Sequence, residues 1–181
     1  MNSTLQRLER MDKRIHEPGF TMPRGIGSDI PHYVLDYPAE DELQVRLYIK
    51  NLHRRTDLNI KEINLFEFLL SFFKDELEEL KELSEEEGIH GLVDALETIL
   101  DEQQTVVESF IEQTEGAEII FITGVGTAYP YIRSSQLLKM LSVNAYRKPI
   151  VLFYPGQFTG LRLKMFGILD NEDDYQLSRI S

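Results

Sequence analysis

The chain has 181 residues, enough to bury one substantial core, and its content of 42% apolar and 10% aromatic residues is ordinary for a globular protein. It contains no cysteine, which excludes disulfides, thiolate metal sites and cysteine nucleophiles. We find neither an apolar run long enough to span a membrane nor a leader with an apolar centre. The expectation is therefore a single cytoplasmic domain over residues 1–181 without membrane contact.

The net charge of −12 is distributed unevenly along the chain. Residues 75–118 contain sixteen Asp and Glu against one Lys, a local charge of −15, whereas the remaining residues together carry +3. Non-specific binding to a nucleic-acid duplex is disfavoured, because phosphates are attracted in proportion to the cations that neutralise them. We therefore expect no direct nucleic-acid binding by the chain alone, although a local basic face can exist outside the acidic region.

In chain order, the first part of the sequence predicts a helix at residues 1–16, a loop at 17–30, a strand at 31–37, a helix at 38–55 and a strand at 59–65. Pro38 suits the first turn of a helix, where its missing N–H costs nothing. On that helix we expect Leu43, Leu47 and Leu52 to be buried.

Apolar residues at helical spacing predict an acidic helical region within the same domain at residues 65–115. The segments after it predict a strand at residues 117–123, a helix at 129–141, a strand at 148–154 and two closing strands at 161–169 and 175–180. Strands that alternate with helices indicate an α/β fold. We predict a largely parallel sheet flanked by helices, with antiparallel edge strands near the C-terminus.

Two of the predicted strands end in turns that contain glycine, where ligands and partners of parallel sheets are usually found. One segment reads AEIIFITGVGTAYPYIR and the other KPIVLFYPGQFTGLRLKMFG. The first turn can bind an anion through its backbone N–H groups, or it can be only a tight structural turn. The aromatic residues can anchor an interface or pack in the core. The candidate partner- or anion-binding residues are Gly124, Gly126, Tyr129, Arg133, Tyr154, Pro155 and Gly156.

A basic stripe lies on the helix predicted at residues 38–55. Arg46, Lys50 and Arg54 follow one another at intervals of four residues, and Arg55 is adjacent. Such a face can meet an acidic partner or nucleic acid, or it can simply be solvated.

We find no recognisable catalytic set, metal motif or cofactor motif. No two histidines have the spacing of a helical metal site, and the glycine turn lacks the Lys-Ser/Thr pair of a P-loop. Asp36 at a strand end, with Glu40 and Glu42, can cap the following helix or hold magnesium, and capping is the favoured interpretation. The sequence therefore predicts a protein that is not an enzyme.

The chain resembles the BrxB family of bacterial BREX phage-defence systems. The resemblance covers nearly the whole chain and rests on four stretches: VLDYPAEDELQVR, NLFEFLLSF, FITGVGTAYPYIRSSQLL and PIVLFYPGQFTGLRLKMFG. The glycine-x-glycine turn followed by proline and arginine, together with the tyrosine-proline-glycine turn, is its most specific part.

This resemblance implies a role more than a chemistry, since it brings no catalytic residues with it. It implies a complex with a PglZ-type phosphatase-like protein, an ATPase and an adenine methyltransferase. We expect a non-enzymatic adaptor that docks the PglZ-type protein. The alternatives are a degenerate or active nucleotide- or phosphate-binding protein that uses the turn at residues 124–126, and a subunit that contacts nucleic acid.

Overall fold

The computed structural model describes residues 3–22, 31–72, 101–129, 132–160, 163–165, 169–170 and 177–180, with seven positions between 82 and 98. The middle of the acidic helical region predicted at residues 65–115, from residue 73 to residue 100, therefore lies largely outside the described residues. Pro130 and Tyr131, which follow the first glycine turn, also lie outside them.

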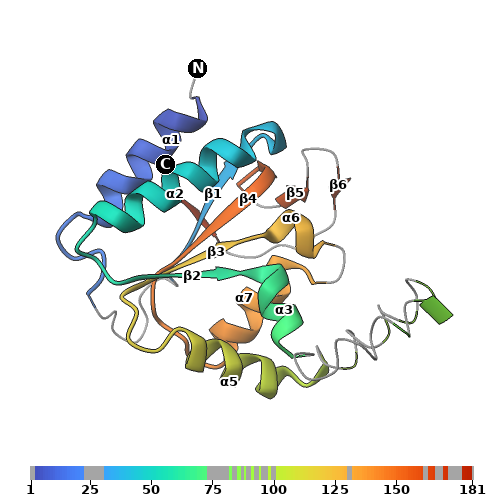
Figure 1. Ribbon diagram of the computed structural model, residues 1–181. Coiled ribbons are helices and arrows are strands. Elements are labelled where there is room, and N and C mark those ends of the chain that lie inside the picture. The colour runs from blue at the N-terminus through green and yellow to red at the C-terminus, as the bar shows by residue number, and fades with distance from the viewer. Residues whose placement is uncertain are drawn as a thin grey trace.

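A parallel sheet with strand order β2-β3-β4-β1-β7 forms the centre of the structure (Figure 1). Its strands are β1 (His32–Tyr37), β2 (Ile60–Asn64), β3 (Ile119–Thr123), β4 (Ile150–Phe158) and β7 (Ser178–Arg179). Every residue of β1 and β3 is buried, as expected of central strands covered on both faces. The predicted α/β fold with a largely parallel sheet is confirmed.

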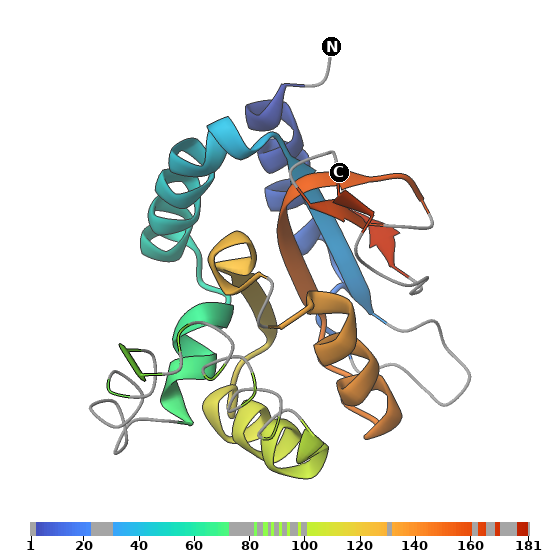
Figure 2. The ribbon, with the colours of Figure 1, turned by 90° about the vertical axis from the view of Figure 1, so that its right-hand side faces the viewer.

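Helices cover both faces of this sheet (Figures 1 and 2). The helices α1 (Thr4–Ile15) and α2 (Glu42–Arg55) pack on one face. On the opposite face lie α3 (Leu65–Ser71), α5 (Gln103–Gln113), the short α6 (Val125–Ala128) and α7 (Ser134–Val143). A 3-10 turn, η1 (Ala39–Asp41), joins β1 to α2. The connections after β1 and after β3 therefore lead to opposite faces.

Antiparallel pairing occurs where β4 extends beyond the parallel sheet. There β4 pairs with β5 (Leu163–Met165), and β5 pairs with β6 (Leu169–Asp170). The edge strand of the main sheet, β7, is parallel to β1. At this edge the predicted antiparallel pairing is therefore replaced by parallel pairing.

The buried stripe of α2 differs from the expected one. Leu52 is buried as expected, but its companions in the core are Val45 and Ile49, whereas Leu43 and Leu47 are 69% and 52% exposed. Positions 45, 49 and 52 lie on one side of a helix with 3.6 residues per turn, and positions 43 and 47 lie on the other. Packing on the sheet selects the side that carries Val45 and Ile49.

The turn after β3 depends on a glycine for two reasons. Gly124 has a φ of +67°, a conformation that costs residues with a Cβ about 1–2 kcal/mol. A Cβ on Gly124 would also lie 2.4 Å from Oδ1 of Asn64. That oxygen accepts hydrogen bonds from the backbone N–H groups of Phe66 and Glu67 and so caps α3. Gly124 therefore leaves room for a helix cap.

A buried histidine stands at the beginning of β1. His32 is fully buried, and burial, assisted by the positive charge of Arg147, lowers the pKa of its imidazole from 6.5 to about 4. The folded protein therefore holds this imidazole neutral at pH values where the unfolded chain protonates it. Stability that depends on His32 is complete above pH 6.5 and is lost as the pH falls toward 4.

We predict that Gly124→Ala destabilises the protein by about 3 kcal/mol, as the sum of the strain at positive φ and the lost Asn64 cap. Gly116→Ala is the matched control, because Gly116 also has a positive φ, of +80°, but a Cβ there meets nothing within 4 Å. It should cost only about 1 kcal/mol. The measurement is the free energy of unfolding in urea. Equal losses in the two variants would show that the contact with Asn64 is unimportant.

We predict that the free energy of unfolding falls by about 2 kcal/mol between pH 7 and pH 5 because of His32 alone. This part of the pH dependence should be missing from His32→Gln when urea unfolding is compared at both pH values. If the variant does not fold, NMR of the wild-type imidazole gives the same information. An imidazole that becomes protonated near pH 6.5 in the folded protein would contradict the prediction.

Candidate functional site

The carboxyl ends of β1, β3 and β4 meet in a small crevice. The chain leaves β1 toward α2 on one face and leaves β3 toward α6 on the other, and ligands of parallel sheets bind where such connections diverge. A hollow of about 250 Å³ lies there. Its lining residues are Ala39, Glu42, Arg46, Gly124, Gly126, Thr127 and Pro155.

A second hollow, of about 510 Å³, lies beside the first, between α2 and the ends of β2 and β3. Its lining residues are Arg46, Lys50, His53, Arg54, Glu62, Asn64, Thr123 and Gly124. Arg46 and Gly124 line both hollows. The structure therefore brings the glycine turn and the basic stripe, which the sequence presented as separate candidates, to one place.

The outward side of α2 combines basic and apolar side chains. Helical geometry places Leu43, Arg46, Leu47, Lys50 and Arg54 within about 100° of one another around the helix axis. All five are exposed. We call these five residues the α2 face. Sequence reasoning found its three cations but missed its two leucines.

Arg46 has a fixed position within the α2 face. Its Nε donates a hydrogen bond of 2.9 Å to Oε1 of Glu42, and Oε2 of Glu42 accepts a hydrogen bond from the hydroxyl of Tyr37 at 2.5 Å. Burial, together with this hydrogen bond, raises the pKa of Tyr37 and keeps the phenol protonated as a donor. Within the described residues, no ion pair or hydrogen bond occupies the side chains of Lys50 and Arg54. Two cations of the face are therefore available to a partner.

Arg55, the fourth cation predicted for the basic face, is not part of it. Its guanidinium pairs with Asp12 of α1 and stacks over the ring of Tyr48, at 5.7 Å from the ring centroid. The hydrogen bond to Asp12 raises the pKa of Arg55 further above its usual range. Arg55 fastens α2 to α1 through Asp12, although half of its side chain remains exposed.

The other predicted site residues are dispersed. Tyr154 is fully buried in the core, so it does not form part of an exposed surface, and Tyr129 is half-buried against the same core. Arg133 is exposed at the residue before α7 and lines neither hollow described above. The helix predicted from residue 129 begins at Ser134 instead, and Tyr129 is the C-cap of the preceding helix α6. Gly156 lies near the end of β4 and lines a separate hollow together with Asp36.

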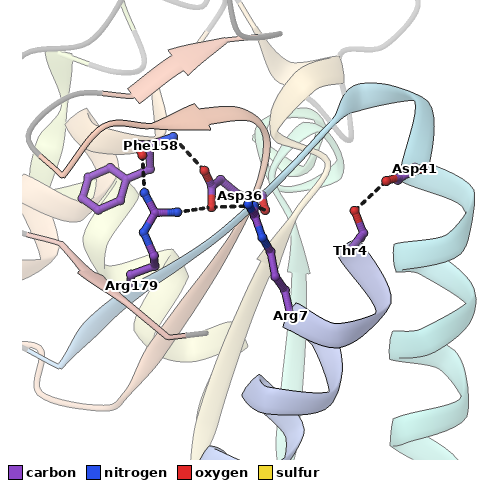
Figure 3. Close-up of polar contacts among 6 residues, drawn as sticks. All are labelled: Thr4, Arg7, Asp36, Asp41, Phe158 and Arg179. Carbon is purple, nitrogen blue, oxygen red and sulfur yellow. Dashed lines mark hydrogen bonds and ion pairs between the residues drawn. The ribbon is translucent and has the colours of Figure 1, made fainter. Parts of the chain in front are cut away.

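Asp36 connects its own strand, β1, to α1, β4 and β7 (Figure 3). It neither caps α2 nor has an oxygen free for a metal ion. Its buried carboxylate accepts hydrogen bonds from Arg7 of α1 at 3.2 Å, from Arg179 of β7 at 2.8 Å and from the backbone N–H of Phe158 at 3.0 Å. The residues that begin η1 and α2 receive no side-chain cap. The capping prediction is therefore wrong, and both carboxylate oxygens already have N–H donors.

Polar side chains at the ends of β2 and β3 are also engaged in structural contacts. Asn64 caps α3, and the hydroxyl of Thr123 donates a hydrogen bond of 2.8 Å to Glu62. Glu62 also lies 3.6 Å from Nε2 of His53 on α2. These contacts hold the walls of the larger hollow in place.

Two further properties concern only the part of the chain that the structure describes. Within it, no three His, Asp or Glu side chains are arranged to hold a metal ion. Across the same residues, the helices fall short of the length and apolar content that a membrane span requires.

Comparison with known proteins assigns the chain to a family. The family model described as "BREX protein BrxB" matches residues 61–180. A protein named BREX protein BrxB from Bacillus cereus (strain H3081.97) is 28% identical over 180 residues, which cover 94% of each chain. Another of that name from Escherichia coli O9:H4 (strain HS) is 27% identical over 180 residues, covering 96% of this chain and 90% of that one. No solved structure matches. The chain therefore belongs to the BrxB family, whose members are components of BREX phage-defence systems.

Proposed function

We propose that this protein is a non-enzymatic adaptor of a BREX complex and that it docks a PglZ-type phosphatase-like protein. The ATPase and the adenine methyltransferase of the system are further proposed partners. Family membership supports a role inside a BREX system. The choice of the PglZ-type protein as the direct partner is part of the proposal.

The observation that carries the adaptor role is the composition of the α2 face. Leu43 and Leu47 are 69% and 52% exposed and lie one helical turn apart, with Arg46 between them in the sequence and Lys50 and Arg54 after them. Burying a leucine side chain is worth about 1.5–3 kcal/mol, so exposing two of them on one face leaves binding energy for a partner. A helix side that only meets solvent is usually polar throughout.

A non-enzymatic role is supported by the structural contacts that the polar groups at the strand ends already make. Asp36, Asn64 and Thr123 stand at the carboxyl ends of β1, β2 and β3, where catalytic groups of parallel sheets are usually found. Each is engaged in a contact that positions a neighbouring element. We propose that the fold uses this edge of the sheet to hold a docking surface in shape.

A second candidate function, phosphate or nucleotide binding at residues 124–126, is favoured by the proximity of Arg46 to Gly124 in the crevice. The packing around Gly124 favours the adaptor instead. Phosphate-binding turns use glycine so that a ligand can approach the backbone. At Gly124 the space of the missing side chain is taken by the carboxamide of Asn64.

The test is co-expression with the PglZ-type protein of the same BREX system, followed by size-exclusion chromatography with light scattering. We expect a complex of defined stoichiometry. Surface charge contributes to docking through Arg46, Lys50 and Arg54, so the complex should weaken as salt is raised. Two separate peaks at low salt would contradict docking of this partner and would direct the search to the ATPase or the methyltransferase.

A further inference from the structure

We infer that the α2 face binds an acidic amphipathic segment of a different protein chain, with two apolar anchors flanked by carboxylates. This inference rests on the proposed adaptor function and specifies the chemistry of the partner at the docking surface. It follows from the shape of the α2 face, from its charges and from the hollow beside it.

The shape of the α2 face fits a segment that runs along a helix. From Leu43 to Arg54 the face extends about 16 Å, or three helical turns. Leu43 begins the face, Arg46 and Leu47 follow one turn later, and Lys50 and Arg54 continue it. Helix-in-groove partners present apolar anchors at intervals of three or four residues, which match the spacing of the two leucines.

The charges of the α2 face select an acidic occupant. Arg46 is held in place by Glu42, whereas Lys50 and Arg54 have no ion-pair partner among the described residues. The hollow of about 510 Å³ beside them provides room for carboxylate side chains. Glu62 also lines this hollow, and its carboxylate already accepts a hydrogen bond from the hydroxyl of Thr123.

Two other occupants fit less well. A nucleic-acid backbone would neutralise the cations, but it offers nothing apolar to cover Leu43 and Leu47. A second copy of this chain could present the exposed acids of α5, Glu108 and Glu112, with Ile111 between them, which is 45% exposed. That contact would join different surfaces of the two copies, and such head-to-tail contacts form rings or open filaments. A different chain gives a closed complex.

The binding test uses two double variants of the full chain with the PglZ-type protein. Arg46→Glu with Lys50→Glu, and Leu43→Ala with Leu47→Ala, should each raise the Kd at least about tenfold. The matched charge control is Lys13→Glu with Lys61→Glu. Lys13 lies on α1, and Lys61 lies on β2, where the alternation of side chains directs it away from α2. The apolar control is Val143→Ala, which is 85% exposed at the end of α7. Both controls should bind like wild type, and thermal unfolding confirms that each variant is folded.

If the complex forms and the α2-face variants bind as tightly as wild type, the inference is wrong while the adaptor function stands. If no complex forms, the proposed partner is wrong, and the occupant of the face is then determined directly. For that purpose a photo-crosslinking amino acid replaces Leu47 in cells that express the complete BREX system. Mass spectrometry identifies the crosslinked segment.

A crosslink to an acid-rich amphipathic segment of another BREX component supports the inference, whichever component supplies it. A crosslink to a second copy of this chain, to a segment without acidic residues, or to no protein at all overturns it. Anisotropy with a labelled 20-base-pair duplex is measured in parallel. Duplex binding that Arg46→Glu with Lys50→Glu abolishes would assign the face to nucleic acid and would also overturn the inference.

Discussion

The parallel pairing of β1 with β4 is the constraint on which the site depends. The two strands are far apart in the sequence, yet six residue pairs join them, and the last pair places Tyr37 opposite Pro155. This register brings the start of α2 beside the turn that follows β3, on either side of β4. Without it, the glycine turn and the basic residues of α2 would belong to separate parts of the surface.

The helix α2 has two sides with different tasks. Val45, Ile49 and Leu52 pack on the sheet, and burial of such side chains supplies most of the stability of a helix of this length. At its end, Arg55 fastens α2 to Asp12 of α1. The outward side contributes little to folding, so its leucines and cations are free to serve binding.

Much of the fold could be predicted from the sequence, because long apolar runs such as those of β3 and β4 are typical of buried parallel strands. The α2 face could also have been found by spacing. Val45, Ile49 and Leu52 share one side of the helix, whereas Leu43 and Leu47 share the side of Arg46. The three leucines expected in the core could not all face it.

Other features could not be predicted from local patterns. The cluster around Asp36 depends on Arg7 and Arg179, which only the tertiary fold brings to the end of β1. The role of Gly124 likewise depends on Asn64, a residue of another strand. The edge strand β7 is too short to reveal by itself whether it pairs in parallel.

The most direct test of the account is hydrogen exchange of the backbone amides of this chain, free and in complex with its BREX partner. Docking through the α2 face predicts slower exchange in α2 and in the turn that follows β3, and unchanged exchange in α5. Slower exchange confined to α5, with α2 unchanged, would contradict the account and would place the partner on the acidic side of the molecule.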